Sequence, residues 1–167
     1  MGTAEQGWSG LDITIRTGTG SAGTELAAFD AALCAAGVGD LNLVTLSSVI
    51  PPYSPVRPEE KPVVAEHGDR LYCVLSAAHA REPGSTAWAG LGWTYAEESG
   101  GLFVEHAGPT EEAVVDLIRS SLHDMGELRG RHLGPPQWVT AQASCTDRPA
   151  CAVVVAAYAV QGWGPRD

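Results

Sequence analysis

The sequence predicts a single domain of mixed α and β structure. Its 167 residues fall within the usual size range of one domain, and no repeat or domain-scale linker divides them. About seven segments carry the alternating or short apolar patterns of strands, and two carry the apolar spacing of amphipathic helices. A composition of 44% hydrophobic and 18% charged residues is that of a globular protein able to bury a core.

The first elements are a strand at residues 11–17, a glycine-rich connection at residues 18–23, and a helix. The helix is expected to begin at about Thr24, whose hydroxyl suits an N-cap, and to end near Gly37. Three apolar residues recur at helical spacing and are expected to form its buried face: Leu26, Phe29 and Leu33.

The remaining elements begin with a strand at residues 41–47, which a proline-rich loop at residues 51–62 follows. Further strands are predicted at residues 71–76, 88–96 and 101–106. A long helix starts near Thr110, and its apolar stripe consists of Val114, Ile118, Leu122 and Met125. The last two strands, residues 138–145 and 150–160, are expected to pair as a hairpin.

Charge and lysine content exclude some classes of function. A net charge of −10 argues against a nucleic-acid partner, which needs a basic patch, although it is compatible with a cationic substrate. Lys61 is the only lysine, so the sequence gives no support for a pyridoxal phosphate site, and no metal site is expected. The cysteines and histidines lack metal-ligand spacing: Cys34, Cys73, Cys145, Cys151, His67, His79, His106, His123 and His132.

Location and cysteine chemistry also follow from the pattern. The longest apolar run, residues 150–160, falls short of the ~20 residues that a membrane helix needs. Residues 1–10 lack the features of a signal peptide, so a cytoplasmic protein without a membrane partner is expected. Cys145 and Cys151 either face each other across the predicted hairpin or, as that compartment favours, remain free thiols.

The glycine motif Gly18-x-Gly20-x-x-Gly23 follows a strand and opens a helix, as a dinucleotide-binding fingerprint does. Such a site needs an acidic residue at the end of the next strand, and here that strand ends in Ser47-Ser48. The motif is therefore interpreted as a glycine-rich connection.

The Ser47-Ser48 pair lies before Pro51-Pro52, which alone would indicate a turn. The surrounding sequence changes this interpretation. Three runs are informative: Phe29-Asp30-Ala-Ala-Leu33, Gly37-Val-Gly39-Asp-Leu-Asn42-Leu-Val-Thr-Leu-Ser-Ser48-Val-Ile-Pro-Pro52 and Gly101-Leu-Phe-Val-Glu105. These runs resemble the pyruvoyl-dependent arginine decarboxylases over nearly the whole chain. The resemblance implies a layered α/β/β/α sandwich of the type found in pyruvoyl-dependent histidine and arginine decarboxylases.

The resemblance further implies that the chain cuts itself between Ser47 and Ser48. The single domain, residues 1–167, would then consist of a β chain, residues 1–47, and an α chain, residues 48–167. Ser48 would attack the carbonyl of Ser47 and become a covalent pyruvoyl group, which forms a Schiff base with the substrate and accepts electrons during decarboxylation. Asn42 matches the position that assists processing as a donor to the oxyanion.

Other roles also come from the resemblance. Glu105 matches the proton donor of decarboxylation, and the adjacent His106 is a titratable neighbour that could alter proton supply. Asp30 matches the residue that meets the guanidinium of arginine, and its place beside Leu26 and Leu33 puts it on the expected core-facing stripe. The apolar pocket positions are Leu26, Leu33 and Val49.

Two alternatives to an arginine enzyme stay open. Asp30 would also attract another cationic amino acid, such as ornithine, lysine or histidine. A binding or assembly subunit could keep the fold without self-cleavage. The resemblance also implies a homo-oligomer, a trimer of αβ protomers or a dimer of trimers, with active sites between subunits.

Overall fold

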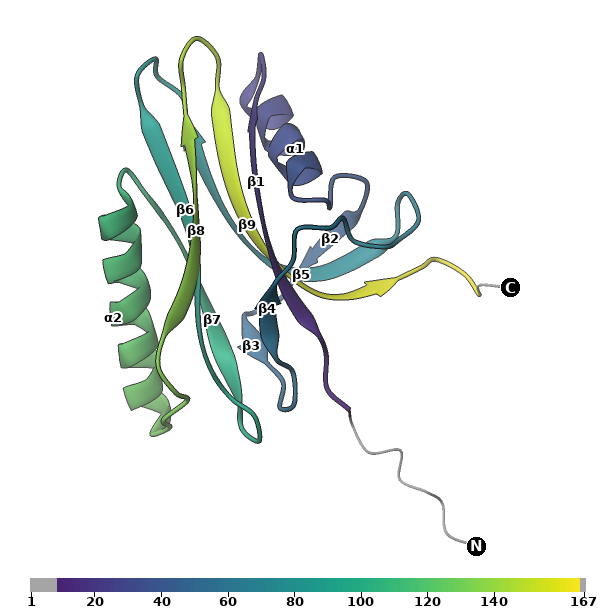
Figure 1. Ribbon diagram of the computed structural model, residues 1–167, viewed down its shortest axis with the longest axis vertical. Coiled ribbons are helices and arrows are strands. Elements are labelled where there is room, and N and C mark those ends of the chain that lie inside the picture. Colours follow the sequence, from purple (N-terminus) through teal and green to yellow (C-terminus); the bar gives the residue numbers. More distant parts are fainter. Residues whose placement is uncertain (1–8, 166–167) are drawn as a thin grey trace, which may run out of the picture.

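The computed structural model describes residues 9–165, so most of the segment in which no signal peptide is expected lies outside the described residues. Two β-sheets pack face to face, and one helix covers the outer face of each (Figure 1). Helix α1 is Glu25–Ala35 and helix α2 is Glu111–Arg129. The predicted α/β/β/α sandwich is confirmed. None of the described helices is long and apolar enough to cross a membrane.

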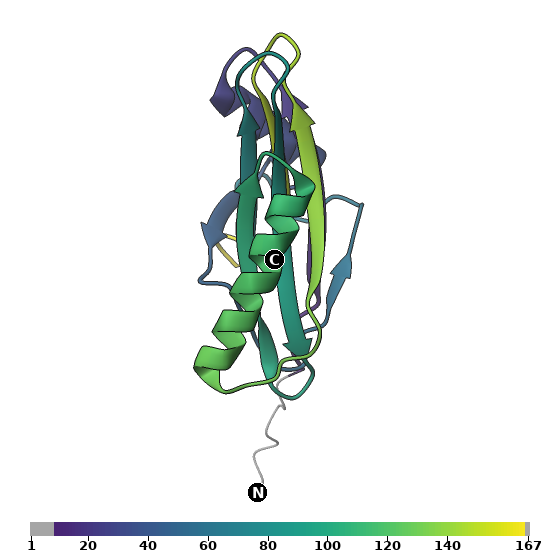
Figure 2. The same cartoon turned by 90° about the vertical axis from the view of Figure 1, so that its left-hand side faces the viewer.

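The first sheet has the strand order β2-β5-β9-β1-β4 and the second has the order β3-β7-β6-β8. The strands of the first sheet are β1 (Ile13–Ser21), β2 (Asn42–Thr45), β4 (Val56–Pro58), β5 (Arg70–Ala80) and β9 (Ala150–Gln161). Those of the second sheet are β3 (Val49–Ile50), β6 (Thr86–Ala96), β7 (Gly100–Gly108) and β8 (Gln137–Ser144). Figure 2 shows α2 lying along the second sheet.

Three apolar cores lie between the four layers. Strand β9 contributes to two of them, because Val154 and Ala156 face the second sheet whereas Val153 and Val155 face α1. A strand that is covered on both faces reads as a continuous apolar run, which explains residues 150–158. The third core lies under α2 and contains the predicted stripe, of which Val114, Ile118 and Leu122 are buried.

Side-chain caps define the start of both helices, and the cap predicted at Thr24 is confirmed. The Thr24 hydroxyl accepts a hydrogen bond from the Ala27 N–H at 3.1 Å, and the Thr110 hydroxyl accepts one from the Ala113 N–H at 3.2 Å. Gly37, which follows the C-cap residue Ala36, has φ +76°, a conformation that glycine adopts at little cost, and the predicted end of the helix is confirmed.

The predicted buried face of α1 is partly wrong. Leu26 is 77% exposed, and the buried residues of the helix are Ala28, Ala32 and Leu33. Asp30 is exposed, so the expected core-facing carboxylate is also wrong. Small alanines face β1 because the helix approaches that strand very closely.

The close approach depends on glycines within β1. A Cβ atom on Gly18 would lie 2.0 Å from the Ala32 carbonyl oxygen, and one on Gly20 would lie 2.5 Å from the Ala31 Cβ. Both glycines belong to the strand, so the glycine-rich run is not simply a connection as predicted. Their absent side chains provide the space in which α1 packs.

The predicted hairpin at residues 138–145 and 150–160 is wrong. Strand β8 pairs with β6, whereas β9 pairs with β1 and β5, so the turn between them crosses from one sheet to the other. Cys145 lies in the core between the sheets and Cys151 lies in the core under α1. The two thiols are therefore on different faces of β9, and the four cysteines are free.

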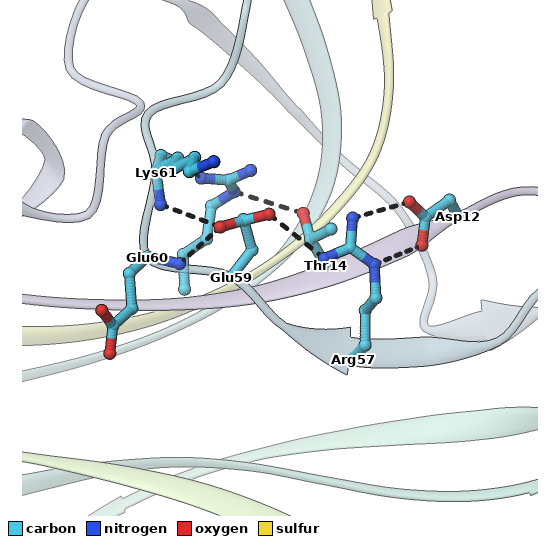
Figure 3. A network of polar contacts seen from close by, with 7 residues as sticks. Asp12, Thr14, Arg57, Glu59, Glu60 and Lys61 are labelled. Atoms are coloured by element: carbon cyan, nitrogen blue, oxygen red, sulfur yellow. Dashed lines mark hydrogen bonds and ion pairs between the residues drawn. The ribbon is translucent and has the colours of Figure 1, made fainter.

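The proline-rich loop contains a short strand, β4, which the sequence does not predict. It pairs in parallel with β1, and Arg57 reinforces this edge through two hydrogen bonds to Asp12, at 2.9 and 2.8 Å (Figure 3). The Glu59 carboxylate accepts hydrogen bonds from the backbone N–H groups of Lys61 at 3.0 Å and Glu60 at 2.9 Å, and from Arg57 at 3.1 Å. The Lys61 N–H and the Arg57 guanidinium lower the pKa of Glu59 to about 2.

Candidate active site

Ser48 lies where the chain leaves the first sheet and enters the second. It is 9% exposed and has φ 69°; of the described non-glycine residues, only Ser48 and Tyr53 have positive φ. A left-handed serine costs of order 1–3 kcal/mol and persists only where neighbouring contacts hold it. The Phe103 N–H supplies one of these contacts by donating to the Ser48 carbonyl oxygen at 2.8 Å.

Ser48 and Glu105, which the resemblance connects, are in direct contact. The Ser48 hydroxyl donates a hydrogen bond to Glu105 Oε1, with an oxygen–oxygen distance of 2.6 Å. Strand β3 follows Ser48 directly and pairs with β7, in the register Val49↔Leu102 and Ile50↔Gly101. This pairing sets the serine beside the part of β7 that carries Glu105.

Strand alternation separates Glu105 from its neighbour His106. Phe103 packs in the core between the sheets, whereas Leu102 and Val104 pack under α2. Glu105 thus shares the face of Phe103, and His106 points to α2, where its Nε2 lies 2.8 Å from the Ser121 hydroxyl. His106 does not contact the Ser48–Glu105 pair, so the structure gives no support to its predicted influence on proton supply.

Tyr158 is a buried polar contact that the sequence does not indicate. Its hydroxyl donates to the Val49 carbonyl oxygen at 2.9 Å, and its ring packs edge-on against Phe103, with 6.0 Å between ring centroids. Burial, and secondarily the charge of Glu105, raise the pKa of Tyr158 well above its ordinary value. The phenol therefore stays protonated and remains a donor.

Three of the predicted substrate residues surround one hollow on the exposed side of α1: Leu26, Asp30 and Leu33 line it together with Thr24, Ala27 and Phe29. The fourth, Val49, does not line it. Val49 is 55% exposed and adjoins Ser48. Figure 1 shows α1 in the upper half of the sandwich and β3 in its lower half. One chain therefore carries the hollow and the Ser48–Glu105 pair as two separate clusters.

Asn42 is exposed at the start of β2, and its side-chain amide donates to the Gly68 carbonyl oxygen at 2.7 Å. Within the described chain, no hydrogen bond joins it to Ser47 or Ser48. Its role in processing stays a prediction.

The fold agrees with comparisons to known proteins. The family described as pyruvoyl-dependent arginine decarboxylase matches residues 12–162. A pyruvoyl-dependent arginine decarboxylase of Pyrococcus abyssi is 38% identical over 133 residues, which cover 78% of this chain and 84% of the relative. A relative of the same description from Halobacterium salinarum is 36% identical over 152 residues, covering 87% and 92%.

The class defined by the fold and these similarities is that of the pyruvoyl-dependent carboxy-lyases. Within it, the chain belongs to the pyruvoyl-dependent arginine decarboxylase family. The residues present fit a pyruvoyl group at position 48. A serine hydroxyl lies there beside a carboxylate, and a backbone N–H holds the carbonyl that would flank the group.

Proposed function

We propose that the chain cuts itself between Ser47 and Ser48 and then converts L-arginine to agmatine and carbon dioxide. The observation that carries this proposal is the 2.6 Å hydrogen bond from the Ser48 hydroxyl to Glu105, at a serine in the left-handed conformation. Family membership supports the same reaction.

Self-cleavage begins with attack of Ser48 Oγ on the carbonyl carbon of Ser47, and the hydroxyl proton passes to Glu105. The amide C–N bond then breaks, the nitrogen of residue 48 takes a proton, and an ester joins the two residues. Removal of the Cα proton of residue 48 expels the Ser47 carboxylate. Water then replaces the nitrogen, which leaves as ammonia, and a pyruvoyl group remains at residue 48. Asn42 assists as a donor to the Ser47 oxyanion, for which it must release Gly68.

The pyruvoyl group supplies a ketone that binds the substrate amine and an electron sink that allows carbon dioxide to leave. Glu105 contacts the side chain of residue 48, so it is the acid placed to give the α-carbon of the substrate the proton that replaces the lost carboxylate. The Phe103 N–H holds the carbonyl of residue 48 in place.

Substrate selection rests on the hollow of α1. The exposed Asp30 carboxylate is free to pair bidentately with a guanidinium, and Leu26, Phe29 and Leu33 supply apolar contacts for a methylene chain. Because the hollow lies away from Ser48 in one chain, we assign the complete site to two copies. The working assembly is a homo-oligomer, either a trimer of αβ protomers or a dimer of trimers.

We also assign the protein to the cytoplasm. The four cysteines are free thiols, which suits a reducing compartment.

Two matched serine variants test the cleavage. Ser48→Ala removes the attacking hydroxyl and should stay a single chain, whereas Ser47→Ala keeps the carbonyl that is attacked and should be cut at the same bond. A cut Ser48→Ala chain would contradict the proposal.

A substrate panel on the processed protein tests the amino acid. Arginine should be consumed in preference to ornithine, lysine and histidine, with agmatine as the product. Preference for another of these amino acids would reassign the substrate and retain the chemistry.

A further inference from the structure

We propose that Tyr158 is a positioning residue of this site. Its hydroxyl holds the Val49 carbonyl and thereby keeps residue 48 against Glu105 after the 47–48 bond is cut. The inference rests on the proposed self-cleavage and adds a residue to the machinery that follows it.

Cleavage creates the need for such a contact. Before the cut, residue 48 is held by the chain on both sides; afterwards it is a chain end, and chain ends fray unless they are tied down. Strand β3 alone holds the new chain end only weakly, because it consists of only two residues, Val49 and Ile50. A displaced residue 48 would lose the alignment with Glu105 on which proton transfer depends.

Tyr158 holds the chain end by a contact from the opposite sheet. It lies on β9, in the first sheet, whereas β3 pairs with β7 in the second sheet. Its hydrogen bond to the Val49 oxygen therefore links the chain end across the sandwich. The side chain is well suited to this because the residue is only 7% exposed and its ring packs edge-on against Phe103.

Two successive carbonyl groups are held in this way. The Phe103 N–H donates to the carbonyl of residue 48, and the Tyr158 hydroxyl donates to the carbonyl of residue 49. The ring of Tyr158 packs against the ring of Phe103, which restricts the position of the Tyr158 hydroxyl. Because the Tyr158 phenol keeps its proton, the second bond persists across the working pH range.

The decisive variant is Tyr158→Phe, which deletes the hydroxyl and keeps the ring. Tyr72→Phe is the matched control: Tyr72 lies on β5 of the same sheet, and its hydroxyl bonds to Gln161 Oε1 at 2.8 Å on the exposed surface. Both variants are produced as the full chain, allowed to self-process, and compared with the wild type by thermal melting to show that they fold.

Hydrogen exchange of the processed protein gives a readout that is independent of activity. The peptide that begins at residue 48 should exchange at least several-fold faster in Tyr158→Phe than in the wild type or in Tyr72→Phe, whereas α2 should be unchanged. In arginine kinetics, kcat should fall roughly tenfold to a hundredfold while KM stays within about twofold, because the substrate hollow is intact.

Wild-type exchange in the peptide that begins at residue 48, together with wild-type kcat in a folded Tyr158→Phe protein, would overturn this inference and leave the proposed function standing. An equal loss in Tyr72→Phe would overturn it too, by showing a general effect of a lost hydroxyl. A wild-type chain that is never cut would instead overturn the proposed function, and this inference with it.

Discussion

Replacement of Gly18 by alanine tests whether the close packing of α1 on β1 depends on the glycines of that strand. The new Cβ atom would lie 2.0 Å from the Ala32 carbonyl oxygen and 2.6 Å from the Ala36 nitrogen. Both are backbone atoms of the helix segment, so no side-chain rotation relieves the contact. Ordinary contacts are about 3.5 Å, which means that the helix must retreat by roughly 1 Å or more.

The expected cost follows from this overpacking. Forcing an extra methyl group into a filled interface costs about 1–3 kcal/mol of unfolding free energy. For a chain of this size, each kcal/mol lowers Tm by roughly 2–4 °C, so Gly18→Ala should melt about 2–12 °C below the wild type. The retreat of α1 also displaces Asp30, and the KM for arginine should therefore rise more than kcat falls.

Thermal unfolding and steady-state kinetics measure the two effects. Gly23→Ala is the control within the same glycine-rich run, because its Cβ would meet no heavy atom within 4 Å. We expect that variant to stay within about 0.5 kcal/mol of the wild type. Equal Tm values for Gly18→Ala, Gly23→Ala and the wild type would refute the packing argument.

Asp30→Asn should raise the KM for arginine roughly tenfold to a hundredfold, because a charge-assisted pair is worth about 1.5–3 kcal/mol. Self-cleavage of this variant should be unchanged. Steady-state kinetics measures the KM, and gel analysis measures the cleavage. Folding lowers the pKa of Glu59 from 4.5 to about 2. The ionised Glu59 carboxylate therefore stabilises the folded state fully above pH 4.5, and this stabilisation is lost as the pH falls toward 2. In melting curves, the Tm of Glu59→Gln should therefore fall less on acidification than the Tm of the wild type. High salt should reduce this difference between the two proteins. A thiol reagent at pH 8 should label the exposed Cys34 but neither Cys73 nor Cys151, since burial raises the pKa of both to about 11. Peptide mass mapping of the labelled, folded protein measures this. A label on Cys73 or Cys151 would contradict the prediction.

Local sequence signals predict the helices and long strands well. Thr24 caps its helix as expected, because a cap is a contact between neighbours in the chain, and α2 begins next to Thr110 as predicted. The short strands β3 and β4 escape prediction, since two or three residues cannot display a period. The partners of β8 and β9 escape it as well, because a turn does not reveal whether the chain crosses to the other sheet.

Site residues were predictable to different degrees, and for physical reasons. The contact between Ser48 and Glu105 joins positions 57 residues apart, and the resemblance assigned both residues to one reaction where periodicity could not connect them. The left-handed conformation of Ser48 has no signature in its residue type. Tyr158 lies in a run of alanine and valine that is buried throughout, so nothing local separates a hydrogen-bonding tyrosine from core packing.

Intact-mass measurement of the purified, denatured wild-type protein tests the central claim most directly. We expect two fragments, residues 1–47 and 48–167, with borohydride and arginine together adding the mass of bound agmatine to the larger one. A single 17.4 kDa chain that stays uncut on incubation would contradict the account and favour a binding or assembly subunit of the same fold.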